Sequence, residues 1–138
     1  MPIFDASSVQ AALRKLRGDA APILEGQTVL DLTLYELGNI VWKENLASGG
    51  TPEEASEKVK TIVRLLSIME IRRIEPGEMA AIAENAAAHG LTFCDSAYLT
   101  AAHGLATTLI TEDTDLLGAA HDAGAKATPI DQYLKTST

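Results

Sequence analysis

Four acidic side chains occupy positions where carboxylates can bind divalent metal ions. Asp5 ends the short apolar run PIF (2–4), and Asp113 lies just beyond TTLI (107–110), so both follow predicted strands. If those strands are neighbours in a parallel sheet, both carboxylates lie at the same edge of that sheet. Capping of the following helix is an equally open role for each, since Asp is a favoured N-cap residue and one carboxylate can do both.

The other two acids, Glu36 and Asp95, are predicted to lie on helices. Glu36 is four residues from both Leu32 and Ile40, so it shares the inward face of its helix. A carboxylate facing an apolar core is costly unless it is paired or binds a metal, which leaves a salt bridge with Lys or Arg as the alternative. Asp95 opens a further predicted helix, and a simple cap is the alternative role there.

Together these acids predict a metal site built from oxygen ligands. Such ligands suit hard cations, either Mg²⁺ or Mn²⁺. Two such ions can activate a water, stabilise a leaving oxygen and neutralise a phosphate. The three histidines, His89, His103 and His121, lack the spacing of a paired metal site, so structural or surface roles are predicted for them.

Strands and helices are predicted to alternate along the chain. The predicted strands are PIF (2–4), QTVLDLT (27–33), IRRI (71–74), TTLI (107–110) and KATPI (126–130), with a polar tail after the last. Apolar residues at helical spacing fill the segments between them. This alternation predicts a three-layer α/β/α fold with a central, mostly parallel sheet of about five strands.

Two of the predicted helices form an antiparallel arm. Gly49 and Gly50 break the chain, and Thr51-Pro52-Glu53-Glu54 then has the pattern of a helix start, with Thr51 as N-cap and Glu54 closing a capping box. Trp42, on the helix before this break, is assigned either to the core or to an interface. The inward face predicted for the helix after the break consists of Val59, Ile62, Val63, Leu66 and Met69.

Length and composition fit one domain outside the membrane. The chain has 138 residues, of which 46% are hydrophobic, and no apolar run is long enough to span a bilayer. The start, MPIFDASS, lacks the features of a signal peptide, so a full-length cytoplasmic protein is expected. The single cysteine, Cys94, excludes an internal disulfide and is predicted to be a small core residue. The net charge of −8 argues against broad electrostatic capture of nucleic acid, although two bound divalent ions would reduce it to −4.

The chain resembles the PIN-domain family in four segments. These are IFDASSVQ (3–10), LYELGNIVWK (34–43), GLTFCDSAYLTAA (90–102) and LITEDTDLL (109–117). They occur in the order and spacing of that family, and the resemblance covers nearly the whole chain as a single PIN domain, 1–138. The most specific stretch is 90–117. The resemblance implies that Asp5, Glu36, Asp95 and Asp113 are the family's four catalytic, metal-binding acids.

The same resemblance implies supporting roles for neighbouring polar residues. Ser7 occupies the family's small hydroxyl position, and Thr111 that of a Thr expected to orient Asp113 by a hydrogen bond. Asp115 is a candidate additional ligand, although a solvated acid in the first turn of a helix is the favoured alternative. Asn39 is either a hydrogen-bonding residue of the site or an ordinary polar helix residue.

By this resemblance the protein is expected to be a Mg²⁺- or Mn²⁺-dependent ribonuclease, which hydrolyses a phosphodiester with a metal-activated water. A chain this short is most similar to the VapC-type toxins of VapBC toxin–antitoxin pairs. That similarity implies a homodimer inhibited by a VapB-type antitoxin, with the antiparallel arm as the docking surface. A PIN nuclease of RNA processing and a non-catalytic PIN-like scaffold are the alternatives. An Asp-nucleophile phosphatase is disfavoured, because that fold carries a second Asp where this chain has Ser7.

Overall fold

The computed structural model describes residues 1–136 and contains a five-stranded sheet. The strands are β1 (Ile3–Phe4), β2 (Thr28–Leu30), β3 (Glu70–Arg72), β4 (Leu109–Ile110) and β5 (Ala127–Thr128). Their spatial order is β3-β2-β1-β4-β5, and every neighbouring pair is parallel. The central strand β1 lies beside β4, so the positions that follow these two strands lie at one edge of the sheet, as predicted.

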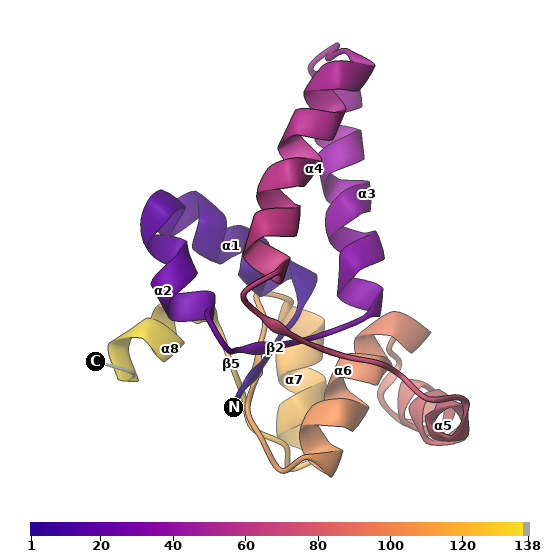
Figure 1. Ribbon diagram of the computed structural model, residues 1–138. Helices are drawn as coiled ribbons and strands as arrows, with labels where there is room; N and C mark the ends of the chain where they lie inside the picture. The colour runs from indigo at the N-terminus through magenta and orange to yellow at the C-terminus, as the bar shows by residue number, and fades with distance from the viewer. Residues whose placement is uncertain (137–138) are drawn as a thin grey trace.

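Helices cover both faces of this sheet (Figure 1). They are α1 (Ala6–Leu16), α2 (Ala20–Leu24), α3 (Leu32–Ala47), α4 (Pro52–Leu66), α5 (Met79–His89), α6 (Phe93–Gly104), α7 (Thr114–Asp122) and α8 (Ile130–Thr136). Short 3₁₀ turns at Arg17–Asp19 and Pro76–Glu78 precede α2 and α5. The predicted three-layer α/β/α fold with a parallel sheet is confirmed. Within residues 1–136, no helix combines the length and the hydrophobicity needed to cross a membrane.

Successive residues of the central strands enter two different hydrophobic cores. Phe4 and Ile110 lie in a core that is covered by α1, α2, α3, α4 and α8. Ile3 and Leu109 lie in the other core, which α5, α6 and α7 cover. Because side chains alternate along a strand and both faces are buried, the first polar residues after these strands emerge at the carboxyl edge of the sheet.

The helices α3 and α4 form the predicted antiparallel arm, which projects from the body of the molecule (Figure 1). The turn before α4 has the predicted capping box, with 3.1 Å from Glu54 N to Thr51 Oγ1 and 3.2 Å from Thr51 N to Glu54 Oε1. Asn45 of α3 fastens the same turn, since its amide group donates to the Thr51 carbonyl and accepts from Lys58. The end of the arm is therefore held by polar contacts.

The inward face predicted for α4 is wrong in part. Val63 is 57% exposed and Val59 is also exposed, whereas Leu66 and Met69 are buried where the arm meets the body. Trp42 of α3 is 56% exposed, which excludes the core position. Beyond the sheet, α3 and α4 bury only the sides that face each other, so their other sides are exposed. Helix α1 contacts one side of the arm, where Arg14 bonds to Glu44 of α3.

Three further local predictions are corrected by the structure. Helix α8 replaces the predicted polar tail, because Glu112 Oε1 accepts a hydrogen bond from the N–H of Ile130 at 2.8 Å and so satisfies the first turn. Helix α6 begins at Phe93 with Thr92 as its N-cap, so Asp95 lies within the first turn. Cys94 is exposed in that turn and is not a core residue.

Candidate active site

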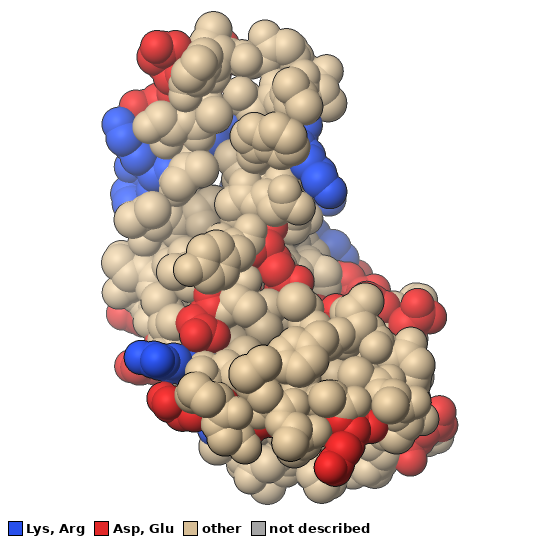
Figure 2. Space-filling view, turned by 90° about the vertical axis from the view of Figure 1, so that its right-hand side faces the viewer, with Lys and Arg blue, Asp and Glu red and all other residues tan. Residues whose placement is uncertain are grey.

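The four predicted acids line one cavity of about 300 Å³. Asp5 follows β1, Glu36 lies on α3, Asp95 lies on α6 and Asp113 precedes α7, so four separate elements contribute one carboxylate each. The other lining residues are Ala6, Ser7, Gln10, Asn39, Ile40 and Tyr98. Figure 2 shows acidic side chains gathered in the hollow where the arm meets the body, with Lys and Arg along the flanks of the arm.

Asp5 is the most deeply buried of these acids, with 5% of its surface exposed. Its Oδ1 accepts hydrogen bonds from the N–H of Ser8 at 2.9 Å and the hydroxyl of Ser7 at 2.7 Å, and so caps α1. Its Oδ2 accepts a hydrogen bond from the hydroxyl of Thr111, at the end of the neighbouring strand. The Asp5 carboxylate therefore both caps α1 and lines the cavity.

The hydroxyl groups of Ser7 and Thr111 join the ends of β1 and β4. Ser7 Oγ accepts the N–H of Glu112 at 3.0 Å and lies 3.3 Å from Thr111 Oγ1. Thr111 Oγ1 accepts the N–H of Asp113 at 3.1 Å. The expected link from Thr111 to Asp113 thus runs through the Asp113 backbone, while the Thr111 hydroxyl proton is donated to Asp5.

Glu36 is half-buried and is held by a tyrosine. The buried hydroxyl of Tyr98 donates to Glu36 Oε1 at 2.5 Å, and it lies 2.6 Å from the hydroxyl of Thr33. The salt bridge weighed as an alternative for Glu36 is absent among residues 1–136. Sequence reasoning missed Tyr98. Its position three residues after Asp95 places both on one side of α6, which was the available signal.

Asp95 and Asp113 lie at the N-terminal ends of two helices. Asp113 is the N-cap of α7, where its Oδ1 accepts the N–H of Asp115 at 2.9 Å and that of Leu116 at 3.3 Å. The N–H of Asp95 donates to Thr92 Oγ1 at 3.1 Å. The capping alternative therefore describes Asp113 but not Asp95, whose half-exposed carboxylate lines the cavity.

The remaining predicted residues are placed less centrally. Asn39 lines the cavity, but its side chain forms no hydrogen bond with the described part of the chain. Asp115 is exposed and does not line this cavity. It lines a neighbouring groove on α7 instead.

Burial and mutual repulsion raise the pKa values of three carboxylates in the cavity. Burial raises the pKa of Asp5 above its ordinary value, against the lowering effect of its hydrogen bonds. Burial also raises the pKa of Glu36, and the negative charges of Asp5 and Asp95 add to that shift. The pKa of Asp95 is raised by burial first and by the charge of Asp113 next. No Lys, Arg or His lines the cavity to offset this negative charge.

This donor set fits a hard divalent cation by its chemistry and charge. Every acid offers carboxylate oxygen, and a cation would neutralise the repulsion that raises these pKa values. Within residues 1–136, however, no three His, Cys, Asp or Glu side chains form a ready-made metal cluster. Both oxygens of Asp5 and one oxygen of Glu36 accept hydrogen bonds from hydroxyl groups instead. A metal would therefore be held through the carboxylate lone pairs that these hydrogen bonds leave free.

Fold and site together define an α/β protein with an acidic cavity at the carboxyl edge of a parallel sheet. The chain is 30% identical over 93 residues to the curated protein Exonuclease VapC9 of Pyrobaculum aerophilum. That match covers 67% of this chain and 66% of the relative, slightly less than two thirds of the relative's length.

A solved structure resembles the whole chain. The crystal structure of PAE2754 from Pyrobaculum aerophilum matches with a TM-score of 0.78 and 28% identity, over 97% of this chain and 93% of that chain. A scan against models of known protein families found no match. The chain therefore has a VapC-like, PIN-type fold.

Proposed function

We propose that this protein is a metal-dependent ribonuclease. The observation that carries the proposal is the convergence of four carboxylates from four elements on one cavity whose lining contains no cationic side chain. Structural acids are normally paired with a base or exposed to water, whereas this group is partly buried and mutually repulsive. The similarity to a protein named as an exonuclease supports a nuclease among the metal-dependent activities.

Asp5, Glu36, Asp95 and Asp113 are the residues that would hold Mg²⁺ or Mn²⁺. When bound, such an ion supplies Lewis acidity toward a water molecule and toward a phosphate oxygen. The chain itself contributes the orientation of the ligands. Ser7 and Thr111 fix Asp5, and Tyr98 fixes Glu36, so two of the four carboxylates are held in place before substrate arrives.

The VapC-like fold favours the toxin of a type II toxin–antitoxin pair as the biological role. Such a protein would act in the cytoplasm as a homodimer and be inhibited by a VapB-type antitoxin. The arm supports a protein partner, because it exposes the large apolar side chains of Tyr35, Trp42, Leu46 and Val63. Apolar side chains gathered in this way are typical of protein–protein interfaces.

Cleavage of labelled RNA tests the proposal. The protein is incubated with RNA labelled at the 5′ end or at the 3′ end, in Mg²⁺, Mn²⁺ or EDTA. The two labels separate cleavage inside the chain from removal of terminal nucleotides. Metal-dependent products with the wild-type protein are expected in Mg²⁺ or Mn²⁺ and none in EDTA.

Matched variants assign the activity to the cavity. Asp95→Asn and Asp5→Asn are expected to abolish cleavage, whereas Asp19→Asn is expected to leave it unchanged. Asp19 is a suitable control because it is exposed and its side chain forms no hydrogen bond with residues 1–136. Cleavage that persists in EDTA, or that survives in Asp95→Asn, would contradict the proposal and leave a PIN-like binding scaffold.

A further inference from the structure

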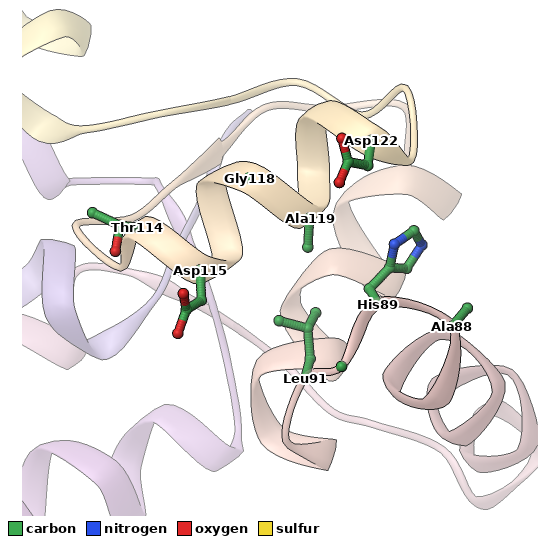
Figure 3. A pocket seen from close by; sticks show the side chains of 9 residues that line it. Ala88, His89, Leu91, Thr114, Asp115, Gly118, Ala119 and Asp122 are labelled. Atoms are coloured by element: carbon green, nitrogen blue, oxygen red, sulfur yellow. The ribbon is translucent and has the colours of Figure 1, made fainter.

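A groove larger than the acidic cavity lies outside the candidate active site. Its volume is about 480 Å³, against about 300 Å³ for the acidic cavity. One wall is the face of α7 formed by Asp115, Gly118, Ala119 and Asp122, which follow the i, i+3, i+4, i+7 spacing of one helix side. The other wall is the end of α5 and the turn that follows it, residues 88–91, as Figure 3 shows.

The groove begins where the acidic cavity ends. Asp113 lines the acidic cavity, and the two residues that follow it, Thr114 and Asp115, line the groove. The charge of Asp115 is close enough to contribute to the raised pKa of Asp95 inside the cavity. A strand of RNA with its phosphate at the acids therefore has an adjacent nucleotide within reach of this groove.

The lining of the groove selects against phosphate and in favour of groups that donate hydrogen bonds. It contains two carboxylates, those of Asp115 and Asp122, and no Lys or Arg. Neither carboxylate, nor the imidazole of His89, forms a hydrogen bond or ion pair with another described residue. In Figure 3, Asp122 and His89 lie together at one end of the groove and Asp115 lies toward the other end, with Leu91 between the ends.

A nucleobase has the shape and chemistry that this lining requires. Its faces are flat and can lie against Leu91 and the imidazole of His89, since unstacked RNA bases are bound by stacking on rings that include His. The exocyclic amino group of cytosine or adenine donates hydrogen bonds, and a carboxylate is a suitable acceptor for the cytosine amino group. Uracil has no such amino group.

We propose that the groove binds the base of a nucleotide next to the scissile phosphate, with Asp115 or Asp122 accepting from the base's amino group. The proposal rests on the proposed ribonuclease function and assigns that function a specificity site. A divalent cation is the competing occupant. The groove offers only two carboxylates, at its two ends, against the four of the acidic cavity, which favours the base.

Gly118 makes the groove testable without disturbing the fold. A Cβ placed on Gly118 would meet no atom within 4 Å, although the residue lies in the middle of α7. A Cβ is therefore tolerated there, and a longer side chain built on it would extend into the groove. Leu suits this purpose because it also favours a helix more than Gly does.

The first experiment measures binding alone and needs no catalysis. Cytidine, adenosine or uridine is titrated into labelled protein in EDTA, and amide chemical shifts are followed by NMR. Shifts at Leu91 and Gly118 are expected with cytidine or adenosine and about tenfold weaker affinity with uridine, the loss typical of one missing hydrogen bond to a charged group. Gly118→Leu should remove the cytidine and adenosine shifts, whereas Gly118→Ala, which fills little of the volume, should retain them.

The second experiment compares the hydrolysis of two substrates at the acidic cavity. Gly118→Leu is expected to lower kcat/KM for RNA by about tenfold or more, chiefly through KM, because uniform binding is lost. Hydrolysis of bis(p-nitrophenyl) phosphate, which carries no base, should stay within about twofold of wild type.

The outcomes separate the two proposals. Absent nucleoside shifts, unchanged RNA cleavage by Gly118→Leu, or Mn²⁺ broadening centred on the groove would each overturn the base site. Nucleoside shifts without hydrolysis of either substrate would overturn the ribonuclease and retain the groove as a base-binding site.

Discussion

Tyr98 of α6 holds Glu36 of α3 through a hydrogen bond of 2.5 Å, although 62 residues separate them along the chain. The bond joins two of the elements that line the acidic cavity, because Asp95 lies on the same side of α6 as Tyr98. Burial and the carboxylate of Glu36 both raise the pKa of the Tyr98 hydroxyl far above its ordinary value, so this hydroxyl remains a donor at physiological pH. The Glu36 carboxylate is thereby fixed in orientation before any metal or substrate binds.

Removing the Tyr98 hydroxyl is expected to weaken both metal binding and the stability of the fold. Tyr98→Phe retains the buried ring but frees Glu36, and loss of such a supporting partner typically lowers metal affinity about 10- to 100-fold. The free energy of unfolding should fall by about 1–3 kcal/mol, as for one hydrogen bond to a charged group. Calorimetric Mn²⁺ titration and urea unfolding measure the two effects.

A tyrosine elsewhere in the fold provides the control for that variant. Tyr133 accepts a hydrogen bond from Gln27 at 3.2 Å and packs edge-on against Phe4, away from the cavity lining. Tyr133→Phe should leave the Mn²⁺ affinity at the wild-type value. Equal losses of affinity in both variants would mean that Tyr98 acts only through general stability.

Thr111 is expected to couple two of the acids through one hydroxyl. It donates to Asp5 and accepts from the backbone of Asp113, and it is fully buried. Thr111→Val keeps the shape but leaves both partners unsatisfied, so we expect unfolding free energy to fall by about 2–4 kcal/mol for the pair. Thr111→Ser should recover most of that loss in urea unfolding, and similar stabilities for the Val and Ser variants would contradict this role.

The metal-free protein is expected to be stabilised by removing Asp95. Its raised pKa means that the folded state binds a proton more tightly than the unfolded state does. The free energy of unfolding of the wild-type protein therefore falls as pH rises from the unfolded-state pKa of Asp95, about 4, through its folded-state pKa. In EDTA at pH 7, Asp95→Asn should have a higher Tm than wild type.

The same linkage predicts how the Tm difference depends on pH. Below about pH 4 the wild-type Asp95 is protonated in both states, so the difference between Asp95→Asn and wild type should shrink toward zero. Added Mg²⁺ at pH 7 should shift the difference in favour of the wild-type protein, because the wild-type site gains more binding energy than the variant's. A Tm for Asp95→Asn that is lower than wild type at every pH in EDTA would contradict the electrostatic account.

The exposed side of the arm is expected to support self-association. Trp42→Asp and Val63→Asp place charges where apolar side chains are more than half exposed, so they should dissociate a dimer without lowering the Tm of the monomer. Sedimentation at several concentrations measures the change, with Glu57→Gln on the same arm as the control. A wild-type protein that sediments as a monomer at all concentrations would contradict this expectation.

The acidic cavity was predictable from the sequence because the position of each acid follows from the residues close to it in the chain. Asp5 and Asp113 follow apolar strands, and the parallel pairing of β1 with β4 brings such positions together. Glu36 was identified from helical spacing, which also keeps it on the inner side of α3. The capping box of Thr51 and Glu54 was predictable for the same reason, since all of its atoms lie within four residues.

The features that were missed depend on contacts between distant segments. Spacing places Tyr98 on the same side of α6 as Asp95, but the sequence does not show that its hydroxyl contacts Glu36. Nor does the sequence show that Glu112 caps α8. The groove exists only because the turn after His89 lies opposite the small residues of α7. Val63 was assigned inward because spacing identifies an apolar face but not whether another element covers it.

The most direct test of the central claim is a calorimetric titration of Mn²⁺ into the metal-free protein at pH 7. The account predicts saturable binding to the wild-type protein, weakened at least about tenfold in Asp95→Asn and Glu36→Gln and unchanged in Asp19→Asn. Undetectable binding to the wild-type protein, or equal binding to all four proteins, would contradict the claim that these carboxylates form a metal site.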